Sequence, residues 1–398
     1  MDDRLYLNAG ADRRLKRGHL WLYSNEIDVG KTPLSALPAG SQAAVCDARG
    51  RFLAWAHINP HTLLCGKVVS FVQAQPFGRE LLRLRLQRAL ALRQGLFAEA
   101  CYRLVYGEAD GLPGLIVDRF FDVLVVQIHS QGMENNRQLI VEELSHLLAP
   151  AGILLRNDHT SRALEGLPQY VEIADGDVPA WAPLVENGVR FEAPLLEGQK
   201  TGWFYDHRPN RARLQGMVSG KRVLDVFSYV GAWGIQAAAV GAREVLCIDS
   251  SPLALEGVAR NAALNGCGER VSTRQGKATE VMKELIDSGE RFDVVVLDPP
   301  AFIKKRKDLA AGETAYHQCN ALALRLLADQ GLLVSASCSM LLAEEKLVDI
   351  VRGAGWQRRS QTLLLSRGEQ GMDHPQHPAI AETRYLKCLF AQIWHNLV

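Results

Sequence analysis

The sequence predicts an α/β protein whose C-terminal half is a doubly wound, mostly parallel β-sheet. From about residue 184 onward, apolar runs of strand length alternate with amphipathic segments of helical length, which is the pattern of βαβ units. The chain has 398 residues, of which 47% are hydrophobic. It is therefore long and apolar enough to build two or three domains with real cores.

The chain divides into three predicted domains. Residues 1–74 contain short β-type runs broken by turn residues and no long helical pattern, which indicates a mostly β domain. Residues 75–183 mix helical and strand patterns, so we expect an α+β domain. A connection that contains proline and tryptophan, residues 178–183, precedes the third domain, residues 184–398.

Hydrophobic periodicity predicts the elements of the second and third domains. In the second we expect a helix, a strand and a helix over residues 80–96, 122–128 and 136–148. In the third, strand-like runs cover residues 222–227, 244–249, 292–297, 331–336, 362–365 and 385–393. Helical patterns cover residues 234–240, 252–265, 279–287, 314–328 and 344–354. No long helix separates the last two strands, so we expect them to close the sheet with an antiparallel edge.

Two acidic residues end consecutive predicted strands, at the carboxyl edge where open α/β sheets bind ligands. Asp225 precedes the loop from Phe227 to Gly231 and suits a cationic or amino-bearing ligand better than a diphosphate. The loop lacks the G-x-G-x-x-G pattern, which disfavours a dinucleotide and hence a dehydrogenase. Asp249 would either accept hydrogen bonds from ribose hydroxyls or cap the helix that begins at Pro252. Together the two acids favour contact with S-adenosylmethionine.

A second pair of strand ends carries the residues expected to perform the chemistry. Residues 298–302 (Asp-Pro-Pro-Ala-Phe) follow one buried strand, and residues 337–339 (Ser-Cys-Ser) follow the next. A cysteine thiolate is a strong nucleophile, and its attack at C6 of cytosine would allow C5 to take a methyl group. Cys338 either only packs, as free cysteines often do, or is the nucleophile of a methyltransferase that modifies a base in RNA, and the neighbouring Asp298 favours the second interpretation. Asp298 would orient the base amine.

Three other features could contact the RNA, and each also has a purely structural interpretation. Phe302 either stacks on the target base or anchors its own loop. The basic run at residues 304–307 either contacts RNA phosphates or forms a solvated face. The same choice holds for the basic run that ends at Arg17, close to Trp21.

Composition and spacing exclude several classes of protein. The formal net charge is only +1, so RNA would be held by local basic patches. The eight cysteines include no C-x-x-C pair, which argues against a zinc site and a disulfide framework, and Cys247 and Cys319 are expected only to pack. His374 and His377 are expected to lie in a loop near the substrate and to bind no metal. We expect no signal peptide, no membrane span and a cytoplasmic location.

These motifs resemble those of class I S-adenosylmethionine-dependent methyltransferases. The resemblance rests on residues 225–231, Asp249, 261–266 and 298–300. Residues 199–208 (Gln-Lys-Thr-Gly-Trp-Phe-Tyr-Asp-His-Arg) are more specific and resemble the segment before the catalytic core in the bacterial ribosomal RNA large subunit methyltransferase I family. Residues 17–27 resemble the start of that family's N-terminal PUA-type RNA-binding module, and residues 107–114 resemble its central domain.

The resemblance implies a Rossmann-like methyltransferase domain behind a PUA-like domain, with S-adenosylmethionine as cofactor. It also implies formation of 5-methylcytosine in large-subunit ribosomal RNA. By the same analogy Tyr205 and Arg208 lie against the cofactor, with Arg208 facing its carboxylate. The expected cofactor contacts are Tyr205, Arg208, Asp225, Phe227, Ser228, Tyr229, Gly231, Asp249, Ser250, Ala278 and Asp298. The expected RNA contacts are Arg17, Trp21, Pro299, Phe302, Lys304, Lys305 and Arg306.

Two positions depart from the family's pattern. His207 stands where the family often carries glutamine, and residues 276–278 (Gly-Lys-Ala) stand where an acidic residue often meets the adenine amine. Lys277 cannot accept that hydrogen bond, so adenine recognition would rest on backbone atoms or another residue. Two other functions stay open: methylation of a base nitrogen, which would not need Cys338, and a non-catalytic RNA-binding assembly factor. The oligomeric state, with a homodimer as one option, the target nucleotide and the acceptor of the C5 proton also stay open.

Overall fold

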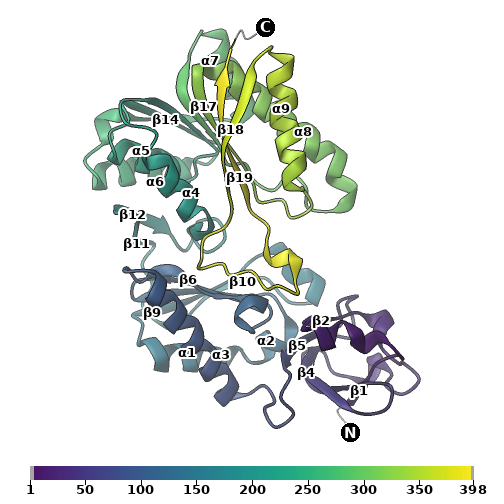
Figure 1. Cartoon of the computed structure of the whole chain (residues 1–398). Helices are drawn as coiled ribbons and strands as arrows, with labels where there is room; N and C mark the ends of the chain where they lie inside the picture. The colour runs from purple at the N-terminus through teal and green to yellow at the C-terminus, as the bar shows by residue number, and fades with distance from the viewer. Residues whose placement is uncertain (1–3, 396–398) are drawn as a thin grey trace. The chain divides into compact units, whose positions relative to one another are not determined.

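The computed structural model describes residues 4–395, which form two compact units (Figure 1). The N-terminal unit contains the chain up to Ala182 together with Leu195–Trp203 and Met372–Thr383. The C-terminal unit contains Pro183–Pro194, Phe204–Gly371 and the chain from Arg384 onward. Neither unit is therefore one continuous segment of the chain.

The N-terminal unit begins with a five-stranded sheet in the order β1-β3-β4-β5-β2. β1 and β3 are parallel, and the other neighbours are antiparallel. Leu5, Val45 and Ala54 are fully buried in its core, because alternate side chains of a strand face the same side of the sheet. The strands are β1 (Arg4–Tyr6), β2 (Trp21–Leu22), β3 (Ser41–Cys46), β4 (Phe52–Ile58) and β5 (Gly66–Ser70).

A second five-stranded sheet of this unit has the order β10-β9-β8-β7-β6. Helices α1 (Arg79–Leu96) and α3 (Arg137–Leu148) bury their apolar faces in one core with it, and the short helix α2 (Gln131–Asn135) precedes α3. This arrangement agrees with the predicted mixture of helices and strands. The strands are β6 (Cys101–Tyr106), β7 (Leu115–Phe120), β8 (Val123–Ile128), β9 (Gly152–Asn157) and β10 (Tyr170–Gly176).

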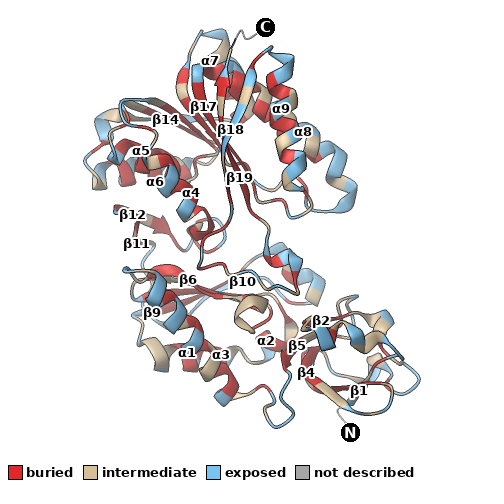
Figure 2. Cartoon of the chain, in the orientation of Figure 1, coloured by how far each residue is buried: buried red, intermediate tan, exposed pale blue. Residues whose placement is uncertain are grey.

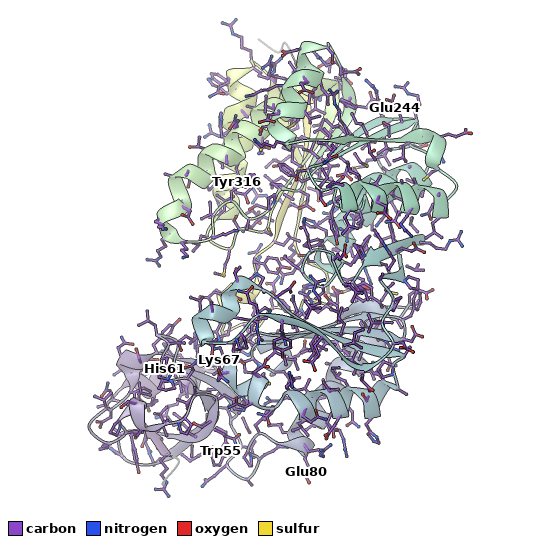
Figure 3. All side chains as sticks on the ribbon, turned by 180° about the vertical axis from the view of Figure 1, so that it is seen from behind. Trp55, His61, Lys67, Glu80, Glu244 and Tyr316 are labelled. Carbon is purple, nitrogen blue, oxygen red and sulfur yellow. The ribbon has the colours of Figure 1, made fainter. Side chains whose placement is uncertain are left out.

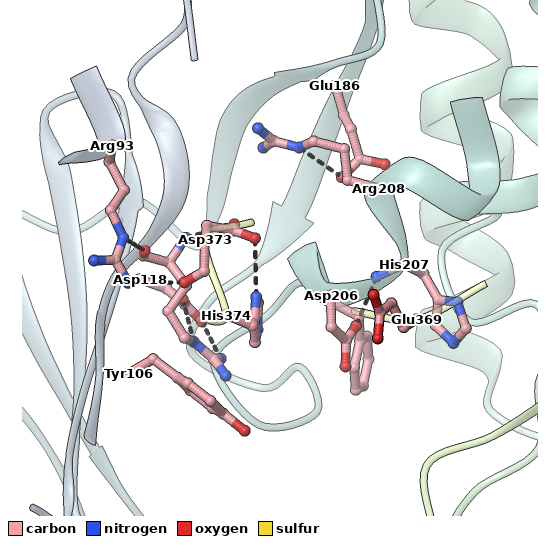
Figure 4. A network of polar contacts seen from close by, with 12 residues as sticks. Arg93, Tyr106, Asp118, Glu186, Asp206, His207, Arg208, Glu369, Asp373 and His374 are labelled. Atoms are coloured by element: carbon pink, nitrogen blue, oxygen red, sulfur yellow. Dashed lines mark hydrogen bonds and ion pairs between the residues drawn. The ribbon is translucent and has the colours of Figure 1, made fainter. Parts of the chain in front are cut away.

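A buried ionic network holds Met372–Thr383 in the N-terminal unit (Figure 4). Arg93 is fully buried and donates to both carboxylate oxygens of Asp110, at 2.6 and 2.8 Å. It also donates to the backbone carbonyl of Asp373 at 2.9 Å. The Asp373 carboxylate in turn accepts the backbone N–H of Arg103 at 3.0 Å. Because buried charges are stable only when they are paired, these contacts hold the segment in place.

The C-terminal unit is built on a seven-stranded sheet in the order β15-β14-β13-β16-β17-β19-β18. The first five strands are parallel, and β19 runs antiparallel to both of its neighbours. The predicted antiparallel closure of the sheet is therefore confirmed. The strands are β13 (Arg222–Val226), β14 (Glu244–Asp249), β15 (Val271–Gln275), β16 (Phe292–Leu297), β17 (Leu327–Ser337), β18 (Gln361–Gly368) and β19 (Lys387–Trp394).

Helices cover both faces of this sheet, whose central strands are almost wholly buried (Figures 1 and 2). On one face, α7 (Ala278–Asp287), α8 (Leu309–Leu326) and α9 (Glu344–Gln357) share a single core with the strands. On the other face lie α4 (Arg208–Gln215), α5 (Ala232–Ala239) and α6 (Pro252–Leu264). The predicted α/β class with a doubly wound sheet is confirmed.

A β-hairpin occupies part of the connection predicted over residues 178–183, which is a correction to the sequence-based assignment. Its strands are β11 (Trp181–Glu186) and β12 (Val189–Pro194). The turn residues Asn187 and Gly188 have φ angles of 52° and 79°. Asn-Gly is a strong signal for such a turn because both residues tolerate positive φ.

Two boundaries near β17 also differ from the prediction. α8 begins at Leu309 instead of residue 314 and ends at Leu326 instead of residue 328. Leu327 pairs with Phe292 of β16, so residues 327 and 328 belong to the sheet. β15 was not predicted, because most of its residues are exposed and its polar sequence carries no hydrophobic pattern.

The division into three domains at residues 74 and 183 stays a prediction. Among the described residues, no helix combines the length and the apolar character needed to cross a membrane.

Candidate active site

Four neighbouring parallel strands bring the predicted acids and the thiol to one edge of the seven-stranded sheet. Asp225 lies near the end of β13, and Asp249 is the last residue of β14. Asp298 follows β16 directly, and Cys338 follows β17. Since the strands are adjacent and parallel, all four residues lie at the carboxyl edge, which is the ligand-binding edge of open α/β sheets.

The loop after β13 has an unusual backbone that begins helix α5 abruptly. Phe227 and Tyr229 have φ angles of 64° and 50°, and Gly231 has a φ of 82°. A Cβ at Gly231 would lie 2.9 Å from Cγ1 of Ile235, so the turn requires glycine. Ser228 is buried, and its N–H donates to the carbonyl of Ile248 at 3.0 Å. The loop therefore passes close over the strand ends.

Asp225 lies beneath this loop and is fully buried. Its Oδ2 accepts the N–H of Gly234 at 2.8 Å, whereas its Oδ1 has no hydrogen-bond partner among the described residues. Burial raises the pKa of Asp225 to about 7, and the charges of Asp298 and Asp249 add to this effect. An ammonium group at Oδ1 would donate a hydrogen bond to this oxygen and stabilise the ionised form of the carboxylate. The amino group of S-adenosylmethionine fits this requirement.

Asp249 joins two loops instead of capping α6. Its Oδ2 accepts the N–H of Tyr229 and its Oδ1 accepts that of Ser251, both at 2.9 Å. The hydroxyl of Ser251 caps α6 by accepting the N–H of Ala254 at 3.3 Å. Each oxygen of Asp249 keeps a second lone pair, which could accept a ribose hydroxyl. Ser250, also a predicted contact, is exposed beside it.

The predicted adenine position lies at the start of α7. Ala278 is buried, and the N–H of Gly276 donates to the carbonyl of Asp249 at 3.0 Å. The side chain of Lys277 is exposed and lies 3.2 Å from Glu280. The Lys277 ammonium is therefore paired with an acid of α7 at the surface.

Asp298 is held by two side chains, Trp233 and His207, for which the sequence predicted no role in the site. The indole N–H of Trp233 donates to Oδ2 at 3.0 Å, and Nε2 of His207 lies 3.2 Å from Oδ1. Burial opposes the charge of Asp298, yet the neighbouring imidazole and these hydrogen bonds outweigh it and lower its pKa. Asp298 is therefore an ionised acceptor at neutral pH. His207, one of the two departures from the family pattern, is thus one of the two side chains that contact this carboxylate.

The predicted cofactor residues Tyr205 and Arg208 lie together, and Glu186 joins them. The guanidinium of Arg208 lies 5.2 Å from the ring centre of Tyr205, and its Nε is 3.7 Å from Oε2 of Glu186 (Figure 4). Glu186 is buried and also pairs with Arg211 through two bonds of 2.6 and 3.0 Å. Sequence reasoning missed Glu186, whose only local signal is its place before the Asn-Gly turn.

Cys338 differs in exposure from the other cysteines. All eight lie within residues 4–395, and seven are buried, including Cys247 and Cys319 as predicted, whereas Cys338 is partly exposed. The two serines beside it contact Tyr316, which belongs to α8 and is labelled in Figure 3. The hydroxyl of Tyr316 lies 2.8 Å from the hydroxyls of both Ser337 and Ser339. The residues on both sides of the thiol are thus held by a buried tyrosine.

The loop after β16 is tied to the loop that carries Cys338. The N–H of Ile303 donates to the hydroxyl of Ser339 at 3.2 Å. Pro299 is buried, and the ring of Phe302 packs edge-on against Tyr316 with 4.9 Å between ring centres. This packing anchors the loop, and the ring of Phe302 is only partly buried, so it could also stack on a base. The following basic residues Lys304, Lys305 and Arg306 are exposed.

The remaining predicted contacts lie in the N-terminal unit. Arg17 is exposed, and the indole N–H of Trp21 donates to Oε1 of Glu108 at 3.0 Å. His374 is buried, with its Nδ1 2.9 Å from Asp373, and Nδ1 of His377 accepts the N–H of Ala379. Within the described residues, no group of three or more histidine, cysteine or acidic side chains could hold a metal ion.

Comparison with known proteins agrees with this geometry. Residues 5–71 match the model of a PUA-like domain, and residues 111–338, more than half of the chain, match that of S-adenosylmethionine-dependent methyltransferases. Proteins named ribosomal RNA large subunit methyltransferase I from Shewanella denitrificans and Vibrio cholerae are each 34% identical to the chain. The alignments cover 98% and 97% of the chain and 99% and 98% of those proteins.

Solved structures share the fold at low sequence identity. A Streptococcus mutans protein classed as a SAM-dependent methyltransferase has a TM-score of 0.82 at 19% identity, and a methyltransferase complexed with SAH has 0.83 at 18%. Each covers 98% of this chain, and the chain covers 99% of each. The fold, the acids at the strand ends and the match to the family model define the chain as a class I S-adenosylmethionine-dependent methyltransferase. More narrowly, the chain belongs to the family of proteins named ribosomal RNA large subunit methyltransferase I.

Proposed function

We propose that this protein methylates C5 of a cytosine in large-subunit ribosomal RNA through a covalent adduct with Cys338. The substrate class follows from the names of its relatives and from the PUA-like match. The observation that carries the cysteine mechanism is local. Cys338 is the one partly exposed cysteine of the chain, and it lies on the strand end next to that of Asp298.

The proposed cofactor site follows the carboxyl edge of β13 and β14. Asp225 takes the amino group, Arg208 the carboxylate and Asp249 the ribose hydroxyls, while the backbone near Ala278 meets the adenine. When bound, S-adenosylmethionine supplies an electrophilic methyl group. The proposed contacts are Tyr205, Arg208, Asp225, Phe227, Ser228, Tyr229, Gly231, Asp249, Ser250, Ala278 and Asp298.

The proposed reaction requires a nucleophile and an acceptor for the base amine. The thiolate of Cys338 forms a bond to C6, and the electron pair that reaches C5 would take the methyl group as its bond to the cofactor sulfur breaks and S-adenosylhomocysteine leaves. A base then removes the C5 proton, the electrons return to the ring, and the C6–S bond breaks to release the thiolate. Each carboxylate oxygen of Asp298 has one protein partner and a lone pair left for the cytosine amine.

We expect residues of each unit to contact phosphates or bases of the RNA. We propose Pro299, Phe302, Lys304, Lys305 and Arg306 in the C-terminal unit, and Arg17 and Trp21 in the N-terminal unit. Extruding a base from a helix costs a few kcal/mol, so we expect a loop or an assembly intermediate as target. We also propose that residues 1–74, 75–183 and 184–398 fold as separate domains.

Methyl transfer from labelled S-adenosylmethionine to unmodified large-subunit rRNA tests the proposal. We expect label in 5-methylcytidine after digestion to nucleosides, and a loss of roughly a thousandfold or more in Cys338→Ala, as for other lost nucleophiles. Cys101→Ala, a buried cysteine of the N-terminal unit, should retain activity. RNA that contains 5-fluorocytidine should trap a covalent complex with the wild type only. Label in another nucleoside, or full activity of Cys338→Ala, would instead favour methylation of a base nitrogen.

A further inference from the structure

Lys387 is a buried lysine whose amine lies in the loop that carries Cys338. It is the first residue of β19 and stands opposite Ser337 of β17, with 7% of its surface exposed. Its Nζ donates to the carbonyl of Ser339 at 2.6 Å and to that of Tyr385 at 2.8 Å. An ammonium group has three donors, so two of them bind carbonyls that flank the site.

The charge of this amine has no carboxylate to neutralise it. Among the described residues, no Asp or Glu oxygen lies within 4.0 Å of Nζ of Lys387. The acid whose charge influences it, Glu344, pairs instead with Arg367 at 2.7 Å and Arg384 at 3.3 Å. Lysine is rarely buried without a partner, so a neighbouring group that becomes negative would be strongly favoured here.

Cys338 is such a group. The charged groups that act on Lys387 are Cys338 and Glu344, which favour its ammonium form, and Arg384, which opposes it. A cation beside a cysteine stabilises the thiolate, which is the reactive form in attack on a base. The carbonyl bonds of Lys387 hold the amine in place beside the thiol's loop.

We propose that Lys387 is the positioning residue that supplies the counter-charge for the Cys338 thiolate. The inference rests on the proposed role of Cys338 as nucleophile. The ammonium keeps the sulfur ionised before it attacks C6 and stabilises it again when the C6–S bond breaks. No proton needs to pass between the two groups during the reaction.

The lowered pKa of Lys387 also sets a pH window for this effect. Burial lowers the pKa of Lys387 to about 8, although the nearby thiolate opposes this shift. Below about pH 8 the amine is charged and supports the thiolate, whereas above it the amine is neutral and the support is lost. A purely structural role, in which Lys387 only binds the two carbonyls, would show no such window.

Alkylation of Cys338 by iodoacetamide tests the inference without RNA or cofactor, because the thiolate is the reactive form and the other cysteines are buried. The rate would be measured from pH 6 to 9.5 on the full chain, by mass spectrometry of the Cys338 peptide. Lys387→Gln keeps N–H donors but removes the charge, and Lys387→Arg keeps the charge. Lys346→Gln, on an exposed lysine paired with Glu313, is the matched control.

At pH 7 we expect Lys387→Gln to react about tenfold or more slowly than the wild type, the effect of losing a close opposite charge. The two profiles should converge above pH 9, and Lys387→Arg should restore most of the rate. If arginine lowers the melting temperature too far, the convergence alone decides. Superimposable profiles of Lys387→Gln and wild type would overturn the inference, as would equal slowing by glutamine and arginine in folded protein. Absence of 5-methylcytidine with an intact alkylation effect would refute the proposed function alone.

Discussion

The loops after β13 and β17 leave the same edge of the sheet but are held in different ways. The β13 loop takes its shape mainly from its own backbone, in which Phe227 and Tyr229 are left-handed, and one side chain, Asp249 of the adjacent strand β14, accepts the N–H of Tyr229. The β17 loop is held by side chains from distant elements, Tyr316 of α8 and Lys387 of β19. The proposed cofactor loop therefore takes most of its shape from its own residues, whereas the loop of Cys338 depends on residues that the fold brings together.

The largest expected effect concerns the β13 loop and pH. Because Asp225 has a raised pKa of about 7, its carboxyl group is mostly protonated below pH 7. It must lose this proton before it can bind a cationic amine. The dissociation constant for S-adenosylmethionine should rise by roughly tenfold per pH unit below pH 7. Isothermal titration calorimetry between pH 5.5 and 7.5 measures this. Asp225→Asn should bind weakly with no such slope, and a wild-type slope equal to that of the variant would contradict the prediction.

The next effect concerns the β17 loop. Tyr316→Phe leaves the buried hydroxyls of Ser337 and Ser339 without this partner, and buried unsatisfied groups cost about 1–3 kcal/mol. We expect a loss of about 2 kcal/mol in unfolding free energy, together with slower methyl transfer. Urea unfolding measures the first. Affinity for S-adenosylmethionine should stay near that of the wild type, and an equal loss of cofactor affinity would show that the two loops are not held independently.

The smallest effect concerns two helical glycines, one packed tightly behind the β13 loop and one with open space around it. A Cβ at Gly234 would lie 2.8 Å from Sγ of Cys247 and 3.1 Å from Oδ2 of Asp225, whereas at Gly353 of α9 the nearest atom is 4.0 Å away. Gly234→Ala should destabilise by about 1 kcal/mol or more through overpacking. Gly353→Ala should stabilise by up to about 1 kcal/mol, because alanine is the better helix former. Thermal unfolding of both variants decides, and changes of the same sign would refute the argument.

Much of the fold and part of the site could be predicted from local patterns. The strands that end in Asp249 and before Asp298 are apolar runs bounded by polar turns, which mark buried parallel strands. Topology then places their ends at one edge. β15 escaped prediction because it is polar and mostly exposed. The hairpin around Asn187 was missed although its turn carries a clear signal.

By itself, the sequence determined the doubly wound fold, the edge where the acids and Cys338 meet, and the resemblance to a methyltransferase family. Only the tertiary structure decided which partners surround these groups. Trp233 and His207 hold Asp298, and Lys387 lies in the loop of Cys338. Short-range patterns reflect periodicity and turn chemistry along the chain, whereas these contacts join polar groups that are tens of residues apart. Such partners become neighbours only when the sheet and its helices have packed.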